Sequence, residues 1–189
     1  MNITNDTLFL EDISVETLMQ EYGSPLYVYE ESVLRSQFRQ LSSGFPEGLL
    51  EIHYSMKANS NPSLLKILRE EGSSIDAVSE FEVRLALESG FEPQQIIFTG
   101  NNNSLAEIEY CVEQEVSVNL GSLVLLEKFG QRFPQTSVSV RINPGIGAGH
   151  HAHCITGGPD SKFGIYHDQI DVALALATKY KLTLNGVHS

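Results

Sequence analysis

The amino-acid sequence predicts an α/β fold of parallel strands and helices, arranged as in an eight-stranded β/α barrel. From residue 49 onward, short apolar strands, polar or glycine-rich turns and amphipathic helices follow one another, an order typical of parallel sheets. Residues 137–143 alternate strictly between polar and apolar side chains. The central strands of a doubly wound sheet would be apolar throughout, because helices cover both faces. The alternation therefore favours a barrel whose interior is polar near its mouth.

The individual elements can be assigned in chain order. Helical segments show apolar residues at positions i, i+3 and i+4, as in Leu64, Leu65 and Leu68. The strand at 116–120 repeats the alternation, with Ser117 and Asn119 on its polar face. We expect strands near 50–56, 74–78, 95–99, 116–120, 137–143 and 182–188, and helices near 62–71, 79–90, 104–114, 122–131 and 168–180.

The strand count indicates an incomplete barrel. A closed barrel of this type needs eight strands, whereas about six can be assigned in this sequence. The missing strands would leave an open edge, so we expect a fragment of a longer protein or a chain that needs a complementing piece. We assign residues 1–48 to a segment that precedes the barrel and residues 49–189 to the first part of the barrel.

Composition excludes several classes of function. The chain has 189 residues, 41% hydrophobic and 19% charged, which is typical of a globular protein. A net charge of −12 argues against a nucleic-acid partner, because phosphate binding needs clustered lysine and arginine. No apolar stretch is long enough to predict a membrane partner. The two cysteines, Cys111 and Cys154, show no paired spacing, so a reducing cytoplasm fits.

Lys57 lies where the first barrel strand gives way to a turn. Alternation along that strand places His53, Ser55 and Lys57 on its polar face. A lysine beside a turn is ordinarily a solvated surface charge. Sites in parallel α/β folds, however, form at the carboxyl ends of the strands, so Lys57 is also a candidate for amine chemistry.

Six motifs stand at residues 54–59, 76–82, 98–101, 141–145, 161–165 and 186–188. In order and spacing, from about residue 22 to residue 189, they together resemble the diaminopimelate decarboxylase family. The resemblance implies an alanine-racemase-like barrel followed by a C-terminal β domain. It also implies pyridoxal 5'-phosphate as cofactor, a small amino-acid substrate, a homodimer, and decarboxylation of meso-2,6-diaminopimelate to L-lysine through an aldimine.

By this resemblance, Lys57 matches the lysine that forms an imine with pyridoxal phosphate. A desolvated barrel interior would lower the pKa of its amine and favour the nucleophilic form. Asp76 matches an aspartate near the cofactor. Glu82 stands at a matching acidic position, but Ser79 and Glu82 also form a Ser-x-x-Glu capping box, and we assign Glu82 to that structural role.

Arg141 and His188 complete the predicted cofactor-binding residues. An inward-facing arginine is costly to bury without a negative partner, which a phosphate or a carboxylate substrate would supply. A salt bridge from Arg141 to Asp76 or Glu82 is the structural alternative. His188 matches the first histidine of a Gly-x-His-x-His segment of the family. The family's remaining site parts lie beyond Ser189, so we expect the 189 residues alone to be inactive.

Three alternatives remain open at this stage. A related decarboxylase for ornithine, arginine or carboxynorspermidine would share every motif, and a pyridoxal-phosphate-binding barrel without turnover would share most of them. A metal-binding module is suggested by His150, His151, His153 and Cys154. Adjacent histidines point apart, so we expect no metal, and the resemblance makes residues 145–165 a glycine-rich loop over the site.

Overall fold

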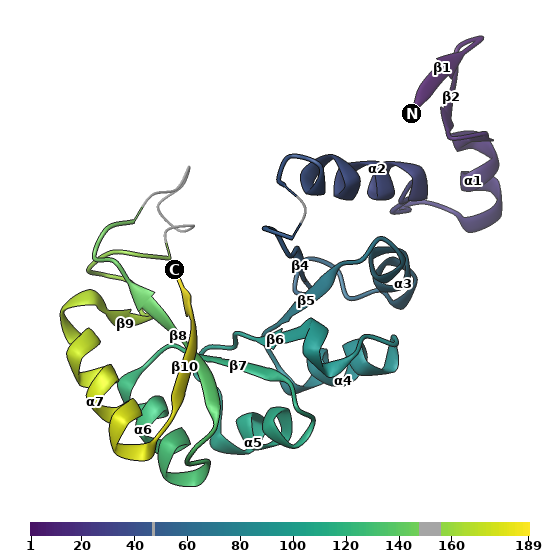
Figure 1. Ribbon diagram of the computed structural model, residues 1–189. Coiled ribbons are helices and arrows are strands. Elements are labelled where there is room, and N and C mark those ends of the chain that lie inside the picture. Colours follow the sequence, from purple (N-terminus) through teal and green to yellow (C-terminus); the bar gives the residue numbers. More distant parts are fainter. Residues whose placement is uncertain (47, 148–155) are drawn as a thin grey trace. The chain divides into compact units, whose positions relative to one another are not determined.

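A computed structural model describes residues 1–46, 48–147 and 156–189 (Figure 1). The chain divides into two compact units, one of residues 1–50 with 67–72 and one of residues 51–66 with 73–189. No helix among the described residues is long and apolar enough to cross a membrane.

The second unit is built on a parallel sheet whose main strands lie side by side in chain order. Neighbours along the sheet are neighbours in sequence, which is the singly wound arrangement of a barrel; a doubly wound sheet would reverse its order part-way. The predicted fold class and the predicted strands are therefore confirmed. The strands are β4 (His53–Ser55), β5 (Ser74–Ala77), β6 (Ile96–Phe98), β7 (Ser117–Leu120), β8 (Ser137–Asn143) and β10 (Thr183–His188).

A further two-residue strand, β9 (Ile165–Tyr166), pairs with the end of β8 and was not expected from the sequence. A run this short has no periodicity to read, because its pairing depends on where the preceding loop brings it. It attaches the end of that loop to the carboxyl end of β8.

In chain order a helix follows each of the strands β4 to β7, and a further helix follows β9. Figure 1 shows α4 to α7 around one side of the curved sheet. Serine side chains cap three of these helices by accepting a hydrogen bond from the backbone of the first turn, namely Ser79, Ser104 and Ser122. The helices are α3 (Pro62–Glu70), α4 (Glu80–Glu88), α5 (Leu105–Glu113), α6 (Leu123–Arg132) and α7 (Ile170–Tyr180), with short 3-10 turns at Pro93–Gln95 and His167–Gln169.

The predicted capping box at the start of α4 is only half formed. Ser79 Oγ accepts from Glu82 N at 3.2 Å, as expected. The Glu82 carboxylate, however, accepts from Val78 N at 2.7 Å instead of from the cap residue itself. Its role is structural, as assigned, but it ties the helix to the loop one residue earlier.

The core of the second unit lies between the helices and the apolar face of the sheet. Strand side chains on that face are almost fully buried, with Ile75 at 0% and Phe98 at 1% exposure. From the helices, Val83, Ile108 and Leu126 are each 0% exposed. Burial of this face leaves the alternate, polar side chains of the same strands on the opposite face.

The first unit contains a small antiparallel sheet and two helices. Its elements are β1 (Asn2–Thr4), β2 (Thr7–Leu10), β3 (Ile13–Ser14), α1 (Val15–Tyr22) and α2 (Glu31–Ser42), together with the end of α3. Neither α1 nor α2 has a buried residue. The packing of these two helices within the first unit must therefore rely on partly exposed contacts and not on buried side chains of their own.

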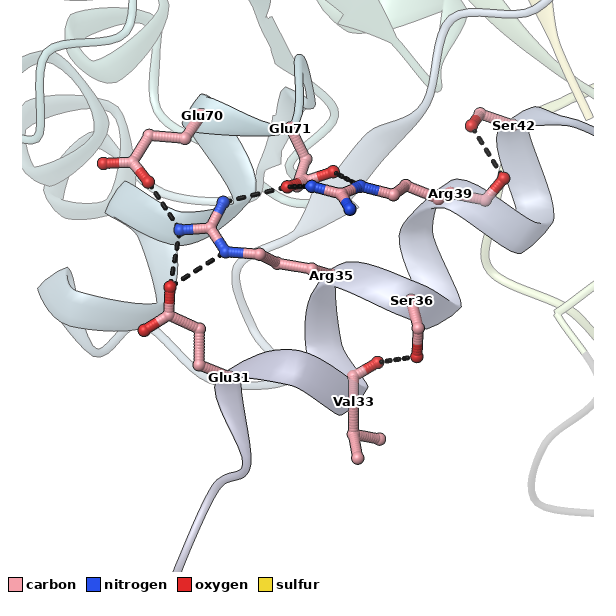
Figure 2. A network of polar contacts seen from close by, with 8 residues as sticks. All are labelled: Glu31, Val33, Arg35, Ser36, Arg39, Ser42, Glu70 and Glu71. Atoms are coloured by element: carbon pink, nitrogen blue, oxygen red, sulfur yellow. Dashed lines mark hydrogen bonds and ion pairs between the residues drawn. The ribbon is translucent and has the colours of Figure 1, made fainter. Parts of the chain in front are cut away.

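Ion pairs join α2 to the residues at the end of α3 (Figure 2). Arg35 contacts Glu31 and Glu70 at 2.6 Å each and Glu71 at 2.8 Å. Arg39 contacts Glu71 at 2.6 Å. Hydrogen bonds from Arg39 and Arg35 lower the pKa of Glu71 to about 2, so its carboxylate stays charged in mild acid.

Candidate active site

The candidate site is the polar face of the second unit's sheet, near the carboxyl ends of its strands. Residues paired across neighbouring parallel strands present their side chains on the same face. Ser55 pairs with Asp76, and Arg141 pairs with His188. The structure thus brings three of the predicted site residues, Asp76, Arg141 and His188, onto one face.

Asp76 on β5 is held by hydroxyl groups from both sides. Ser55 Oγ donates to Asp76 Oδ2 at 2.9 Å, and Thr99 Oγ1 donates to Asp76 Oδ1. Ser55 ends β4, and Thr99 follows β6, so the two donors flank β5. The carboxylate is therefore fixed in place by neutral donors.

Arg141 is partly buried on β8 and has no carboxylate within ion-pair distance in the described part of the chain. Burial lowers the pKa of its guanidinium, and the negative charge of Asp76 opposes that shift. The guanidinium carbon lies 4.5 Å from the centre of the Phe163 ring, a cation–π contact. The alternative of a salt bridge from Arg141 to Asp76 or Glu82 is not observed among these residues.

His188 at the end of β10 is tied to β7. Its Nδ1 lies 3.1 Å from Asn119 Oδ1. Burial and the positive charge of Arg141 lower the pKa of the imidazole, while Asp76 raises it. Asn119 and Ser139 belong to the same polar network but were not predicted as site residues. The only sequence signal was their place on the polar face of alternating strands.

Lys57 lies just beyond the end of β4, where the sequence placed the change from strand to turn. β4 ends at Ser55, and the backbone then turns, with Ala58 N donating to Ser55 O at 3.1 Å. The Lys57 side chain is exposed. Backbone pairing to β5 stops at Met56, whose N donates to Asp76 O at 3.1 Å, so Lys57 is released into the turn. The described residues therefore do not provide the desolvated environment that was expected around the amine.

Asn143 closes the base of the loop that follows β8. This asparagine is 1% exposed, donates to Gly158 O, and accepts from Gly158 N and Gly145 N, each at 3.0 Å. His150, His151, His153 and Cys154 of this loop lie outside the described residues. Among the residues that are described, no group of histidine, cysteine, aspartate or glutamate could hold a metal ion.

Comparison with known proteins gives one family. Residues 31–189 match a family model described as "Pyridoxal-dependent decarboxylase, pyridoxal binding domain". Diaminopimelate decarboxylase from Methanothermobacter thermautotrophicus is 39% identical over 175 residues, which cover 91% of this chain and 41% of that protein. The Escherichia coli K12 diaminopimelate decarboxylase is 34% identical over 184 residues, covering 94% and 43%.

A solved structure agrees with these relatives. The crystal structure of Helicobacter pylori diaminopimelate decarboxylase in complex with L-lysine superposes with a TM-score of 0.84 at 32% identity, over 92% of this chain and 45% of that one. The chain thus spans less than half the length of the relatives it matches. Because residues 31–189 match the pyridoxal-binding domain of this family, the chain belongs to the pyridoxal-dependent decarboxylases.

Proposed function

We propose that this chain forms part of a decarboxylase that converts meso-2,6-diaminopimelate to L-lysine with pyridoxal 5'-phosphate. The observation that carries the proposal is the polar face of the sheet, where Arg141 lacks a carboxylate partner in the described part of the chain and lies on the same face as Asp76 and His188. The relatives named diaminopimelate decarboxylase support this choice of substrate.

The residues present fit this cofactor. A primary amine is needed to bind its aldehyde, and the exposed Lys57 follows directly after β4. A cation is needed for its phosphate or for the carboxylate of an amino acid, and the partly buried Arg141 supplies one. Pyridoxal phosphate, when bound, supplies a ring that accepts the electron pair left by the departing carbon dioxide.

Each site residue then has a distinct role. Lys57 would hold the cofactor covalently between turnovers, and its amine can give or take a proton at Nζ. Arg141 would orient an anionic group through its guanidinium N–H donors. Asp76, fixed by two hydroxyls, presents its carboxylate on the same face as Arg141. His188, with its lowered pKa, is uncharged at neutral pH and can take part in hydrogen bonding.

Further proposals concern the protein as a whole. We propose that residues 1–48 precede the barrel and that residues 49–189 form its first part. A homodimer remains a prediction that rests on the family resemblance, and a cytoplasmic location remains a prediction that rests on the absence of paired cysteines in the sequence.

Borohydride reduction tests the cofactor site. Full-length protein incubated with pyridoxal phosphate should develop a visible absorbance band, and reduction should fix the label on the peptide that contains Lys57. Lys57→Ala should abolish the label, whereas Lys66→Ala, which alters an exposed lysine of α3, should leave it unchanged. Labelling of another residue in the wild-type protein, or of none, would contradict the assignment.

A substrate panel tests the reaction. Release of carbon dioxide from meso-2,6-diaminopimelate, in preference to ornithine, arginine or carboxynorspermidine, is the expected result. Preference for one of the other three would replace the proposal with a related decarboxylase. Labelling of Lys57 without any release of carbon dioxide would instead indicate a pyridoxal-phosphate-binding barrel without turnover.

A further inference from the structure

A buried asparagine links three strands on the polar face. Asn119 on β7 is 3% exposed, although its side chain is an amide. Its Nδ2 lies 2.8 Å from Ser139 Oγ on β8, and its Oδ1 lies 3.1 Å from His188 Nδ1 on β10. Both ends of this buried amide therefore have a hydrogen-bond partner.

Ser139 sets the donor and acceptor roles in these hydrogen bonds. A hydroxyl carries one hydrogen, and Ser139 Oγ donates it to Val118 O at 3.2 Å. Towards Asn119, the same oxygen can then only accept, so it faces the amide nitrogen. The amide oxygen of Asn119 is thereby turned towards His188.

The orientation of the amide fixes the proton on the imidazole. An amide oxygen can only accept, so His188 Nδ1 must carry a hydrogen and donate it. In a neutral imidazole the other nitrogen, Nε2, then has a free lone pair. No described residue hydrogen-bonds to Nε2 of His188.

The surrounding charges favour the neutral ring. Arg141, paired with His188 in register, and burial both lower the pKa of His188, against the opposing effect of Asp76 on β5. Protonation of Nε2 would place a second cation on the face that already holds Arg141.

We propose that Asn119 and Ser139 are positioning residues that hold His188 as the neutral Nδ1–H tautomer, leaving Nε2 to accept a hydrogen bond from an N–H or O–H donor of the bound small molecule. The ammonium group of an amino acid is a donor of this class. The ligand part of this inference rests on the proposed function, whereas the tautomer does not.

Nitrogen NMR of full-length, cofactor-free protein with 15N-labelled histidine tests the tautomer directly. His188→Gln identifies the His188 signals. We expect the Nδ1–H tautomer in the wild-type protein. In Ser139→Ala the amide of Asn119 can rotate, and the tautomer ratio should shift towards Nε2–H by about fivefold, the factor that corresponds to one hydrogen bond of about 1 kcal/mol.

The hydrogen bonds that link Ser139, Asn119 and His188 form a relay. Three further variants separate this relay from general damage to the fold. Ser139→Thr keeps the hydroxyl and should restore the wild-type ratio. Ser137→Ala removes an exposed hydroxyl from the same strand, outside the relay, and should change nothing. Asn119→Asp places a carboxylate beside Nδ1 and should raise the pKa of His188, because it stabilises the protonated ring.

Defined results would overturn the inference. A wild-type ring in the Nε2–H form, or a ratio unchanged by Ser139→Ala, would refute the relay whether or not the protein is a decarboxylase. Addition of pyridoxal phosphate and L-lysine should shift the Nε2 resonance, and an unshifted resonance would refute the acceptor role. If the tautomer is as expected but borohydride does not label Lys57, the relay stands and the cofactor site falls.

Discussion

Replacing Gly164 with alanine tests how the loop after β8 returns to that strand. Gly164 has a φ of +84°, in the region where an L side chain is strained. A Cβ added there would lie 2.8 Å from Asn143 N and 3.0 Å from Ile142 C, both backbone atoms of β8. Neither atom can rotate away as a side chain could, so the loop or the strand end has to move.

The expected loss of stability has two parts. The positive φ costs about 1–2 kcal/mol for an alanine. Crowding against the strand backbone adds about 1–3 kcal/mol, the range found for overpacked sites. The free energy of unfolding should therefore fall by roughly 2–5 kcal/mol in total.

Gly72→Ala is the matched control for this variant. Gly72 has a φ of +88°, but nothing lies within 4 Å of the added Cβ. Both variants share the φ cost and the change in the unfolded chain, so the difference between them isolates the close approach. Urea unfolding of the full-length variants measures the loss of unfolding free energy in each. Equal destabilisation by Gly164→Ala and Gly72→Ala would refute the contact between loop and strand.

Three other changes have defined outcomes. The folded-state pKa of Glu71 is lowered from 4.5 to about 2. Its ion pairs therefore stabilise the fold above about pH 4.5, and this stabilisation is lost as the pH falls towards about 2. The difference in unfolding free energy between the wild type and Glu71→Gln should disappear over the same pH range. Cys111 is buried with its pKa raised to about 12, so thiol reagents should modify it only after denaturation, and rapid modification of the native protein would count against this burial. Arg141→Met removes a charge that lowers the pKa of His188, so NMR titration should find that pKa raised, and an unchanged value would show that the two side chains do not interact.

The architecture of the second unit was predictable because its signals are local. Each strand from β4 to β8 alternates or is apolar over a few residues, and each following helix carries its own apolar stripe and polar start. The order of strands then follows from short right-handed connections between parallel neighbours. β9 and the small antiparallel sheet of β1 to β3 were not assigned, because they lie outside the succession of one strand and one helix by which the other strands were assigned.

The site was only partly predictable, for a related reason. Alternation along one strand placed Arg141 on the polar face without any knowledge of its neighbours, whereas Asp76 was assigned from the family resemblance. The roles of Asn119 and Ser139 depend on the register between strands, which sequence periodicity does not give. The exposure of Lys57 depends on where the pairing of β4 with β5 stops, which is set by hydrogen bonds between strands.

The separation of charge on the polar face explains why it suits a ligand. Asp76 and Arg141 influence one another electrostatically but do not form an ion pair; the carboxylate is satisfied by Ser55 and Thr99, and the guanidinium stacks on Phe163. A cation–π contact contributes about 0.5–2 kcal/mol, less than the several kcal/mol that desolvating a cation can cost. Stability alone would favour a direct pair or an apolar residue at position 141. Asp76 already has two hydroxyl donors, whereas Arg141 has no carboxylate partner in the described part of the chain. An anionic ligand would therefore complete this face by pairing with Arg141, and the phosphate and carboxylate groups of the proposed cofactor and substrate are of that class.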